Sequence, residues 1–155
     1  NQKARTMNIT GPYTSEITKE FLLRLRENNP EGGDKDEPVK LEDFEGHPLL
    51  GKHTMYVVEL EKDLTTEDVL NLLDGHNFQS AALDHLVIFP RLDYPEVEFP
   101  VAVLETPEGD EWTNAEGFKL CPVAEVSPDG RGLILDGHPI NEAWKGKTRF
   151  LVLPG

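Results

Sequence analysis

The sequence predicts an α+β protein whose sheet is largely antiparallel. Two observations carry this prediction: the order of elements is helix, strand, two helices and then several strands, and short turn-separated strands fill the second half. The chain has 155 residues, which suits one domain with a sizeable core. We therefore expect an extended arm over residues 1–13 and a single domain over 14–155, with 30–52 as an acidic, irregular loop region.

The first helix is an extra N-terminal element that follows Gly11-Pro12. Thr14 or Ser15 can cap it, because a hydroxyl accepts a hydrogen bond from the free amides of a first helical turn. Pro30 ends it, since the residue before a proline avoids the helical region. The apolar stripe expected along this helix consists of Ile17, Phe21, Leu22 and Leu25.

The best-signalled part of the chain begins at residue 53. Residues 53–60 have the β-branched and aromatic content of a strand. Thr65 then opens a capping box in which Asp68 takes the usual place of glutamate. The helix that follows is expected to end at Gly75.

A second helix of this part is expected over residues 81–89, with Ser80 as its cap. The nearly continuous apolar run over 99–105 predicts a buried strand. Pro122 interrupts a later strand and indicates an edge position or a bulge. The remaining strand candidates are 111–113, 118–126, 133–135 and 149–153.

The net charge of the chain disfavours some classes of binding partner. The chain has 29 acidic and 15 basic side chains, a formal net charge of -14, so phosphate backbones and anionic membranes are repelled. No apolar run approaches the roughly 20 residues that span a bilayer. We expect no nucleic-acid partner and no membrane insertion, with the cytoplasm as the default compartment. Cys121 is the single cysteine and is expected in the core.

The sequence contains no pattern typical of a catalytic or metal centre. No two histidines have zinc-ligand spacing, and no nucleophile elbow or glycine-rich phosphate loop is present. Asp136, His138 and Glu142 could hold a metal on a helix, but Gly137 and Pro139 disfavour a helix there. We therefore expect no catalytic residue, no metal and no cofactor.

Trp112 and Trp144, the only tryptophans, both lie among polar residues. A tryptophan in such a setting is either a core anchor whose indole N–H finds a partner or part of an exposed recognition surface. Trp144 belongs to a long segment, 136–147, between two strand candidates. We expect this segment to be an irregular loop, and loops on rigid scaffolds often carry binding function.

Several segments together resemble a known group of proteins. The order of motifs is similar to a TTEEVL, ATLEELL, YPE, FPIVAL and W…RFLAV pattern found in small microbial proteins that are mostly uncharacterised. The layout is also similar to C-type-lectin-like domains of the formylglycine-generating-enzyme branch, a scaffold used by variable proteins of diversity-generating retroelements. The segments that carry the resemblance are Thr65–Leu70, Ala82–Leu86, Tyr94–Glu96, Phe99–Leu104 and Trp144 with Arg149–Val152.

This resemblance implies a compact C-type-lectin-like domain in which two helices pack on the sheet. Its function would be non-catalytic binding of a protein or other surface ligand, through a loop surface near the C-terminus. Two alternatives stay open: a small metal-dependent enzyme using Asp136, His138 and Glu142, and a phage-derived assembly component whose arm, 1–13, docks on a neighbour. The expected ligand-binding residues are Trp112, Asn114, Asp136, His138, Asn141, Glu142 and Trp144.

Overall fold

The computed structural model describes residues 7–27, 40–89, 98–126 and 133–155. The chain divides into two compact units, one made of Asn1–Tyr13 with Thr54–Gly155 and the other of Thr14–His53. The sequence predicted one domain over 14–155 instead. The first unit holds most of the sheet and all the predicted site residues.

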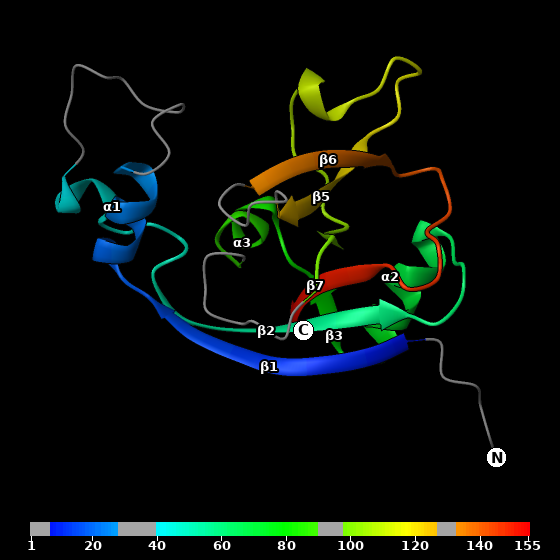
Figure 1. The fold of residues 1–155 in the computed structure, drawn as a ribbon, viewed down its shortest axis with the longest axis horizontal. Coiled ribbons are helices and arrows are strands. Elements are labelled where there is room, and N and C mark those ends of the chain that lie inside the picture. The colour runs from blue at the N-terminus through cyan, green and yellow to red at the C-terminus, as the bar shows by residue number, and fades with distance from the viewer. Residues whose placement is uncertain (1–6, 28–39, 90–97, 127–132) are drawn as a thin grey trace. The chain divides into compact units, whose positions relative to one another are not determined.

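The sheet runs in the order β1-β2-β7-β4-β5-β6, with β3 also paired to β7 (Figure 1). Of the pairings detailed among the described residues, only that of β4 with β7 is parallel. The predicted α+β class is therefore confirmed. The strands are β1 (Met7–Ile17), β2 (Gly51–Leu60), β3 (Phe78–Ser80), β4 (Val101–Ala102), β5 (Leu120–Val126), β6 (Leu133–Pro139) and β7 (Arg149–Pro154).

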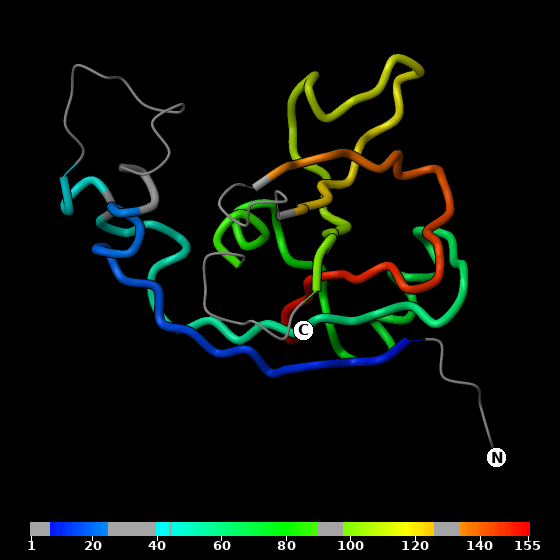
Figure 2. Tube along the Cα trace, in the orientation of Figure 1, coloured from blue at the N-terminus to red at the C-terminus, as the bar shows by residue number. Residues whose placement is uncertain are grey.

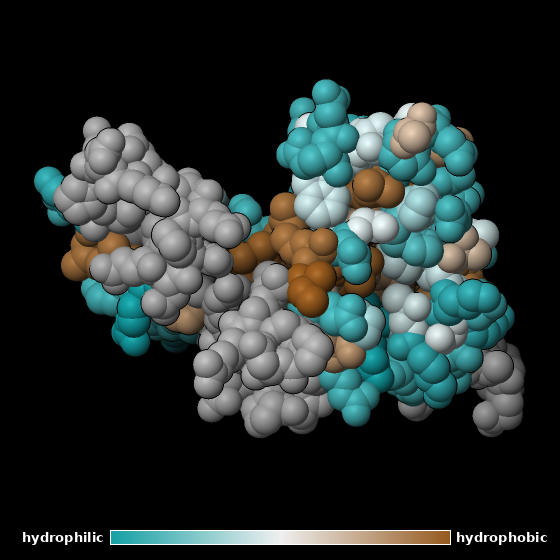
Figure 3. Space-filling view, turned by 45° about the horizontal axis from the view of Figure 1, so that its top comes forward, coloured by the Kyte–Doolittle hydropathy of each residue, from teal (hydrophilic) through white to brown (hydrophobic). Residues whose placement is uncertain are grey.

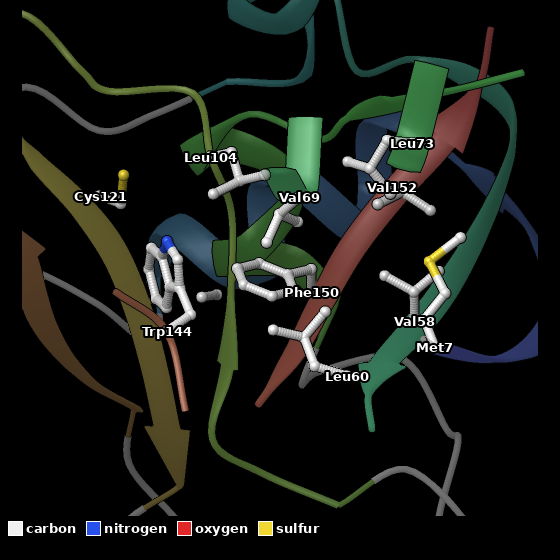
Figure 4. Packing of buried hydrophobic residues seen from close by; sticks show 11 residues of the cluster. Met7, Val58, Leu60, Val69, Leu73, Leu104, Cys121, Trp144, Phe150 and Val152 are labelled. Carbon is white, nitrogen blue, oxygen red and sulfur yellow. The ribbon is translucent and has the colours of Figure 1, made fainter. Parts of the chain in front are cut away.

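The sheet of the first unit buries one cluster against helix α2 (Thr66–Gly75). Successive side chains of a strand point to opposite faces, so β7 turns Phe150 and Val152 to the same side. There they pack with Val69 and Leu73 of the helix, as Figure 4 shows. We call this side of the sheet the α2 face.

The opposite side of the sheet, the α3 face, buries a second cluster against helix α3 (Leu83–Ile88). Leu151 of β7 points to this side and packs with Leu86 of the helix and Ala124 of β5. The two helices therefore cover opposite faces of the sheet. Figure 2 follows the chain through these elements.

The predictions for β2, α2 and β7 are confirmed. The hydroxyl of Thr65 accepts a hydrogen bond from the Asp68 amide at 3.1 Å, as the capping motif predicted. The helix ends at Gly75, and β2 covers the strand expected over 53–60. The closing strand extends one residue beyond the expected Leu153.

The predicted start of the first helix is wrong. Helix α1 spans Lys19–Glu27, and the hydroxyl of Thr18, not of Thr14 or Ser15, accepts the hydrogen bond from the Phe21 amide at 3.1 Å. Ile17, expected in the helical stripe, is the last residue of β1. Its burial follows a period of two within that strand, which outweighs the helical spacing.

Much of the expected arm belongs to the sheet. Residues from Met7 onward form β1, which pairs with β2. Within the first unit the Thr10 hydroxyl donates to the Val57 carbonyl oxygen at 3.2 Å. The part of the expected arm from Met7 onward therefore pairs with the sheet of its own chain. Residues 1–6 lie outside the described residues.

In the Thr14–His53 unit, α1 is accompanied by the short 3₁₀ helix η2 (Leu41–Phe44). Lys19 of the helix forms an ion pair with Glu45. The irregular region expected over 30–52 thus contains a helical turn, and its last two residues belong to β2. Residues 30–39 of that region lie outside the described residues.

Three predictions for the second half of the chain are wrong in their boundaries. Ser80 does not cap a helix over 81–89, because it ends β3 and its hydroxyl accepts the Leu104 amide at 2.7 Å. The strand expected over 99–105 shortens to the two residues of β4. Trp112 lies in the 3₁₀ helix η4 (Asp110–Trp112) and not in a strand over 111–113.

Pro122 lies in an interior strand, contrary to the expected edge or bulge. Its carbonyl oxygen accepts the Val103 amide at 3.0 Å, so its backbone faces the β4 side of β5. The nitrogen of Pro122, which carries no hydrogen, faces the same side of β5, just past the end of β4 at Ala102. The β5–β6 ladder therefore loses no hydrogen bond to this proline.

Among the described residues, no helix combines the length and the apolar content that crossing a membrane requires.

Candidate functional site

Trp144 is an internal brace. Its side chain is buried, and its indole N–H donates to the Thr66 hydroxyl oxygen at 2.9 Å. That hydroxyl in turn donates to the Ile140 carbonyl oxygen at 2.8 Å. The indole ring also meets Phe150 edge-on, with centroids 4.9 Å apart (Figure 4). Of the two roles open to a tryptophan here, Trp144 has that of the core anchor.

The backbone around Trp144 is also tied to distant residues. Its amide donates to the Leu64 carbonyl oxygen at 2.7 Å, and the Leu64 amide donates back at 3.0 Å. Farther on, the Lys147 amide donates to the Leu60 carbonyl oxygen at 2.8 Å. These bonds hold residues 140–147 against the chain that leads into α2. The expected irregular loop over 136–147 is thus shorter, because β6 continues through Pro139.

His138 covers the outer side of the brace. Its ring stacks on Trp144, with centroids 3.8 Å apart and planes inclined by 24°. Its Nε2 lies 3.2 Å from the carbonyl oxygen of Glu142. His138 is half-buried, so part of the residue is exposed to solvent.

Asp136, Asn141 and Glu142 point to solvent. Asp136 lies two residues before His138 on β6, so both side chains stand on the same face of the sheet. Asn141 and Glu142 belong to the turn after β6. This turn is closed by a hydrogen bond of 3.0 Å from the Glu142 amide to the Pro139 carbonyl oxygen. Within the described parts of the chain, these three side chains make no hydrogen bond or ion pair.

Asp136, His138 and Glu142 do not form a metal-binding group. The described residues contain no cluster of three or more histidine, cysteine, aspartate or glutamate side chains placed to share an ion. Asp136 and His138 share one face of β6, and Glu142 lies in the turn that follows. The geometry therefore gives no support to the metal-dependent alternative.

Trp112 and Asn114 lie in a separate turn. The Asn114 side-chain oxygen accepts the amides of Glu116 and Phe118, each at 3.0 Å, so this side chain shapes its own turn. Trp112 is half-buried in η4. The turn meets the other site residues at its base, where the Ile140 amide donates to the Lys119 carbonyl oxygen at 2.8 Å.

Cys121 pairs with His138 across β5 and β6 and is buried in the cluster of the α2 face. Burial raises the pKa of its thiol from 9.0 to about 11, because a thiolate would lose its hydration. The thiol is therefore protonated at neutral pH and is not a nucleophile. The prediction of a core cysteine is confirmed.

A cleft of about 270 Å³ on the α3 face was not predicted by any sequence pattern. Strand register places Glu59 of β2 directly opposite Arg149 of β7. The Arg149 guanidinium lies 3.0 Å from the Glu59 carboxylate and 2.7 Å from that of Glu98. These carboxylates neutralise the only cation among the lining residues. The cleft is lined by Asn8, Thr10, Tyr13, Val57, Glu59, Glu98 and Arg149.

Comparison with known proteins finds no family model, no curated protein and no solved structure that matches the chain.

Proposed function

We propose that the chain is a non-catalytic binding module that recognises a protein or other surface ligand. The recognition surface consists of two side chains of β6 that share one face of the strand, together with two side chains of the turn that follows it. We call it the β6 surface and define it by Asp136, His138, Asn141 and Glu142. Trp144 supports this surface from inside.

The observation that carries the proposal is the buried chain of hydrogen bonds from Trp144 through Thr66 to Ile140. It anchors the turn that presents Asn141 and Glu142, while their side chains stay exposed. Binding costs conformational entropy, and a backbone that is already ordered loses less of it. A polar surface on a fixed base is therefore suited to recognition.

The resemblance to C-type-lectin-like variable proteins supports the same class of function. In those proteins the diversified residues precede a closing W…RF segment, which corresponds here to Trp144 and Arg149-Phe150. The residues at the corresponding place are Asp136, His138, Asn141 and Glu142, and three of them are exposed. A C-type-lectin-like fold and diversification by a retroelement are parts of this proposal. A reverse-transcriptase gene and an imperfect template repeat beside the gene would support the diversification.

Selection of binders from a random-peptide display library and binding to a glycan array would test the proposal. The test variant replaces Asp136, Asn141 and Glu142 with alanine. The matched control replaces one aspartate, one asparagine and one glutamate that are exposed on α2 with alanine, namely Asp74, Asn71 and Glu67. Circular dichroism would establish that both variants fold.

Ligands selected against the unchanged protein are expected to bind the test variant at least tenfold more weakly and the control variant equally well. A tenfold loss corresponds to about 1.4 kcal/mol of binding free energy. Equal binding to both variants would contradict the proposal and would place recognition elsewhere on the molecule.

A further inference from the structure

We infer that the β6 surface recognises its partner by strand addition, in which an extended basic segment of another protein pairs with the outer edge of β6. This inference rests on the proposed binding function and names the class of partner. Strand addition derives affinity from main-chain hydrogen bonds and specificity from alternate side chains.

Strand β6 is the last strand on its side of the sheet. All seven of its residues pair in unbroken register with β5, without a bulge. The hydrogen bond from the Ile140 amide to the Lys119 carbonyl oxygen sets which residues of β6 face β5. In an antiparallel ladder these alternate, so the backbone groups of Leu135 and Gly137 point outward. Among the described residues nothing pairs with them.

The outer edge of β6 has little of the usual protection against a further strand. Natural edges are blocked by charged side chains, above all lysine, by proline, by bulges or by a covering element, and the charged side chain on this edge is Asp136. Pro139 removes the outward donor only at the end of β6, and residues 133–138 include no lysine. On the opposite edge of the sheet, β1 carries Pro12 beside Gly11, whose φ is 117°. Within β1, Pro12 therefore offers no N–H to a further strand, whereas β6 has no proline before Pro139.

Two large apolar side chains flank the open backbone groups. Ile134 is 44% exposed and Leu135 is 39% exposed. As neighbours on a strand they point to opposite faces, so an added strand would cover both with side chains of its own. Figure 3 shows one face of the molecule, on which hydrophobic surface reaches the solvent between hydrophilic residues.

Charge indicates what the added strand carries. Asp136 lies on β6, and Glu125 lies on β5 directly opposite Ile134. Both carboxylates are exposed. Lys119 pairs beyond Pro139, outside the open stretch. The net charge of -14 also disfavours a second copy of this chain as the added strand. A segment that alternates basic and apolar residues complements this edge.

A titration of the full chain, followed by amide NMR spectra, tests the inference. The probe is a nonapeptide of alternating lysine and valine. Its control has the same sequence and charge but carries N-methyl groups on the amides that would pair. The protein variant is Leu135→Pro, which removes an outward donor and leaves the hydrogen bonds to β5 intact.

The expected result is a saturable shift of the Leu135 and Gly137 amides by the probe. Affinity should fall at least tenfold with the methylated peptide and at least tenfold with Leu135→Pro. Two results would overturn the inference: equal binding of both peptides, which indicates charge attraction alone, or self-association that Leu135→Pro abolishes, which indicates a second copy.

The two proposals fail in different ways. If ligands from the library lose affinity for the Asp136, Asn141 and Glu142 variant but bind Leu135→Pro normally, the β6 surface binds without strand addition. Suppose instead that Leu135→Pro no longer binds the lysine–valine peptide, while the alanine variant still binds the library ligands. The proposed role of the Asp136, Asn141 and Glu142 side chains is then wrong, and strand addition at the edge of β6 is supported.

Discussion

Two turns of this protein each carry a tryptophan among polar residues, yet they are held in different ways. The Trp112 turn, residues 110–119, is closed by the side chain of Asn114 on amides of the same turn. The Trp144 segment, residues 138–147, is held by Thr66 and Leu64, which precede it by more than seventy residues. The first turn depends on local hydrogen bonds and the second depends on the core.

This difference determines what each turn can present. A locally closed turn opens without disturbing the rest of the fold. A turn fixed to the core keeps its outward side chains in place until the core itself opens. This difference supports the proposal that recognition lies at the β6 surface, while the Asn114 side chain closes its own turn.

The largest effect is expected from Trp144→Ala. It removes a buried aromatic side chain together with its hydrogen bond, and should lower the free energy of unfolding by about 3–5 kcal/mol. Trp144→Phe, which keeps a ring but loses the N–H donor, should cost less. Urea unfolding followed by circular dichroism measures both. A loss below about 1 kcal/mol for Trp144→Ala would remove the distinction between the two turns.

Thr66→Val should have the next largest effect. The variant keeps the shape of the side chain but leaves the Trp144 N–H and the Ile140 carbonyl without their shared partner. The expected loss is about 1–3 kcal/mol by urea unfolding. Thr66→Ser retains the hydroxyl and serves as the control. If valine and serine destabilise the protein equally, the hydroxyl does not anchor the segment.

Asn114→Ala tests the other turn. It deprives two exposed amides of a side-chain acceptor, which is comparable to losing a helix cap and should cost about 1 kcal/mol. Asn114→Asp keeps the acceptor and should cost less. Amide NMR shifts should change within 110–119 and not around Trp144. Changes that spread to the Trp144 segment would show that the two turns act as one unit.

The smallest effect concerns Cys121 and is confined to high pH. Its pKa is raised from 9.0 to about 11 in the folded protein, so the unfolded chain loses this proton first. The thiol's contribution to stability is therefore complete below pH 9 and is lost as the pH rises toward 11. Cys121→Ala should show a smaller decline over that interval in parallel urea titrations. An equal decline of the free energy of unfolding in both proteins would contradict the raised pKa of Cys121.

Sequence patterns predicted those features of the fold that are determined by residues close together in the chain. The cap at Thr65 and the end of α2 at Gly75 were predicted correctly, because a helix end is set within a few residues. The first helix was mispredicted because Ile17 fits both a helical stripe and a strand. Only pairing with β2 decides between these patterns.

The candidate site was predicted less completely. Asp136, Asn141 and Glu142 were expected at the surface, where they lie. The roles of Trp144 and Thr66 depend on a contact across 78 positions, which no local pattern encodes. The open edge of β6 likewise depends on strand order, and the Glu59–Arg149 pair depends on register.

Native-state hydrogen exchange tests the central claim, that the Trp144 segment is a platform fixed to the core, most directly. The amides of Leu64, Trp144 and Lys147 should exchange only through global unfolding, so their exchange free energies should equal the free energy of unfolding. The Gly117 amide, bonded to the Asn114 carbonyl within the Trp112 turn, should exchange through local opening. Exchange of Trp144 as fast as that of Gly117 would contradict the claim.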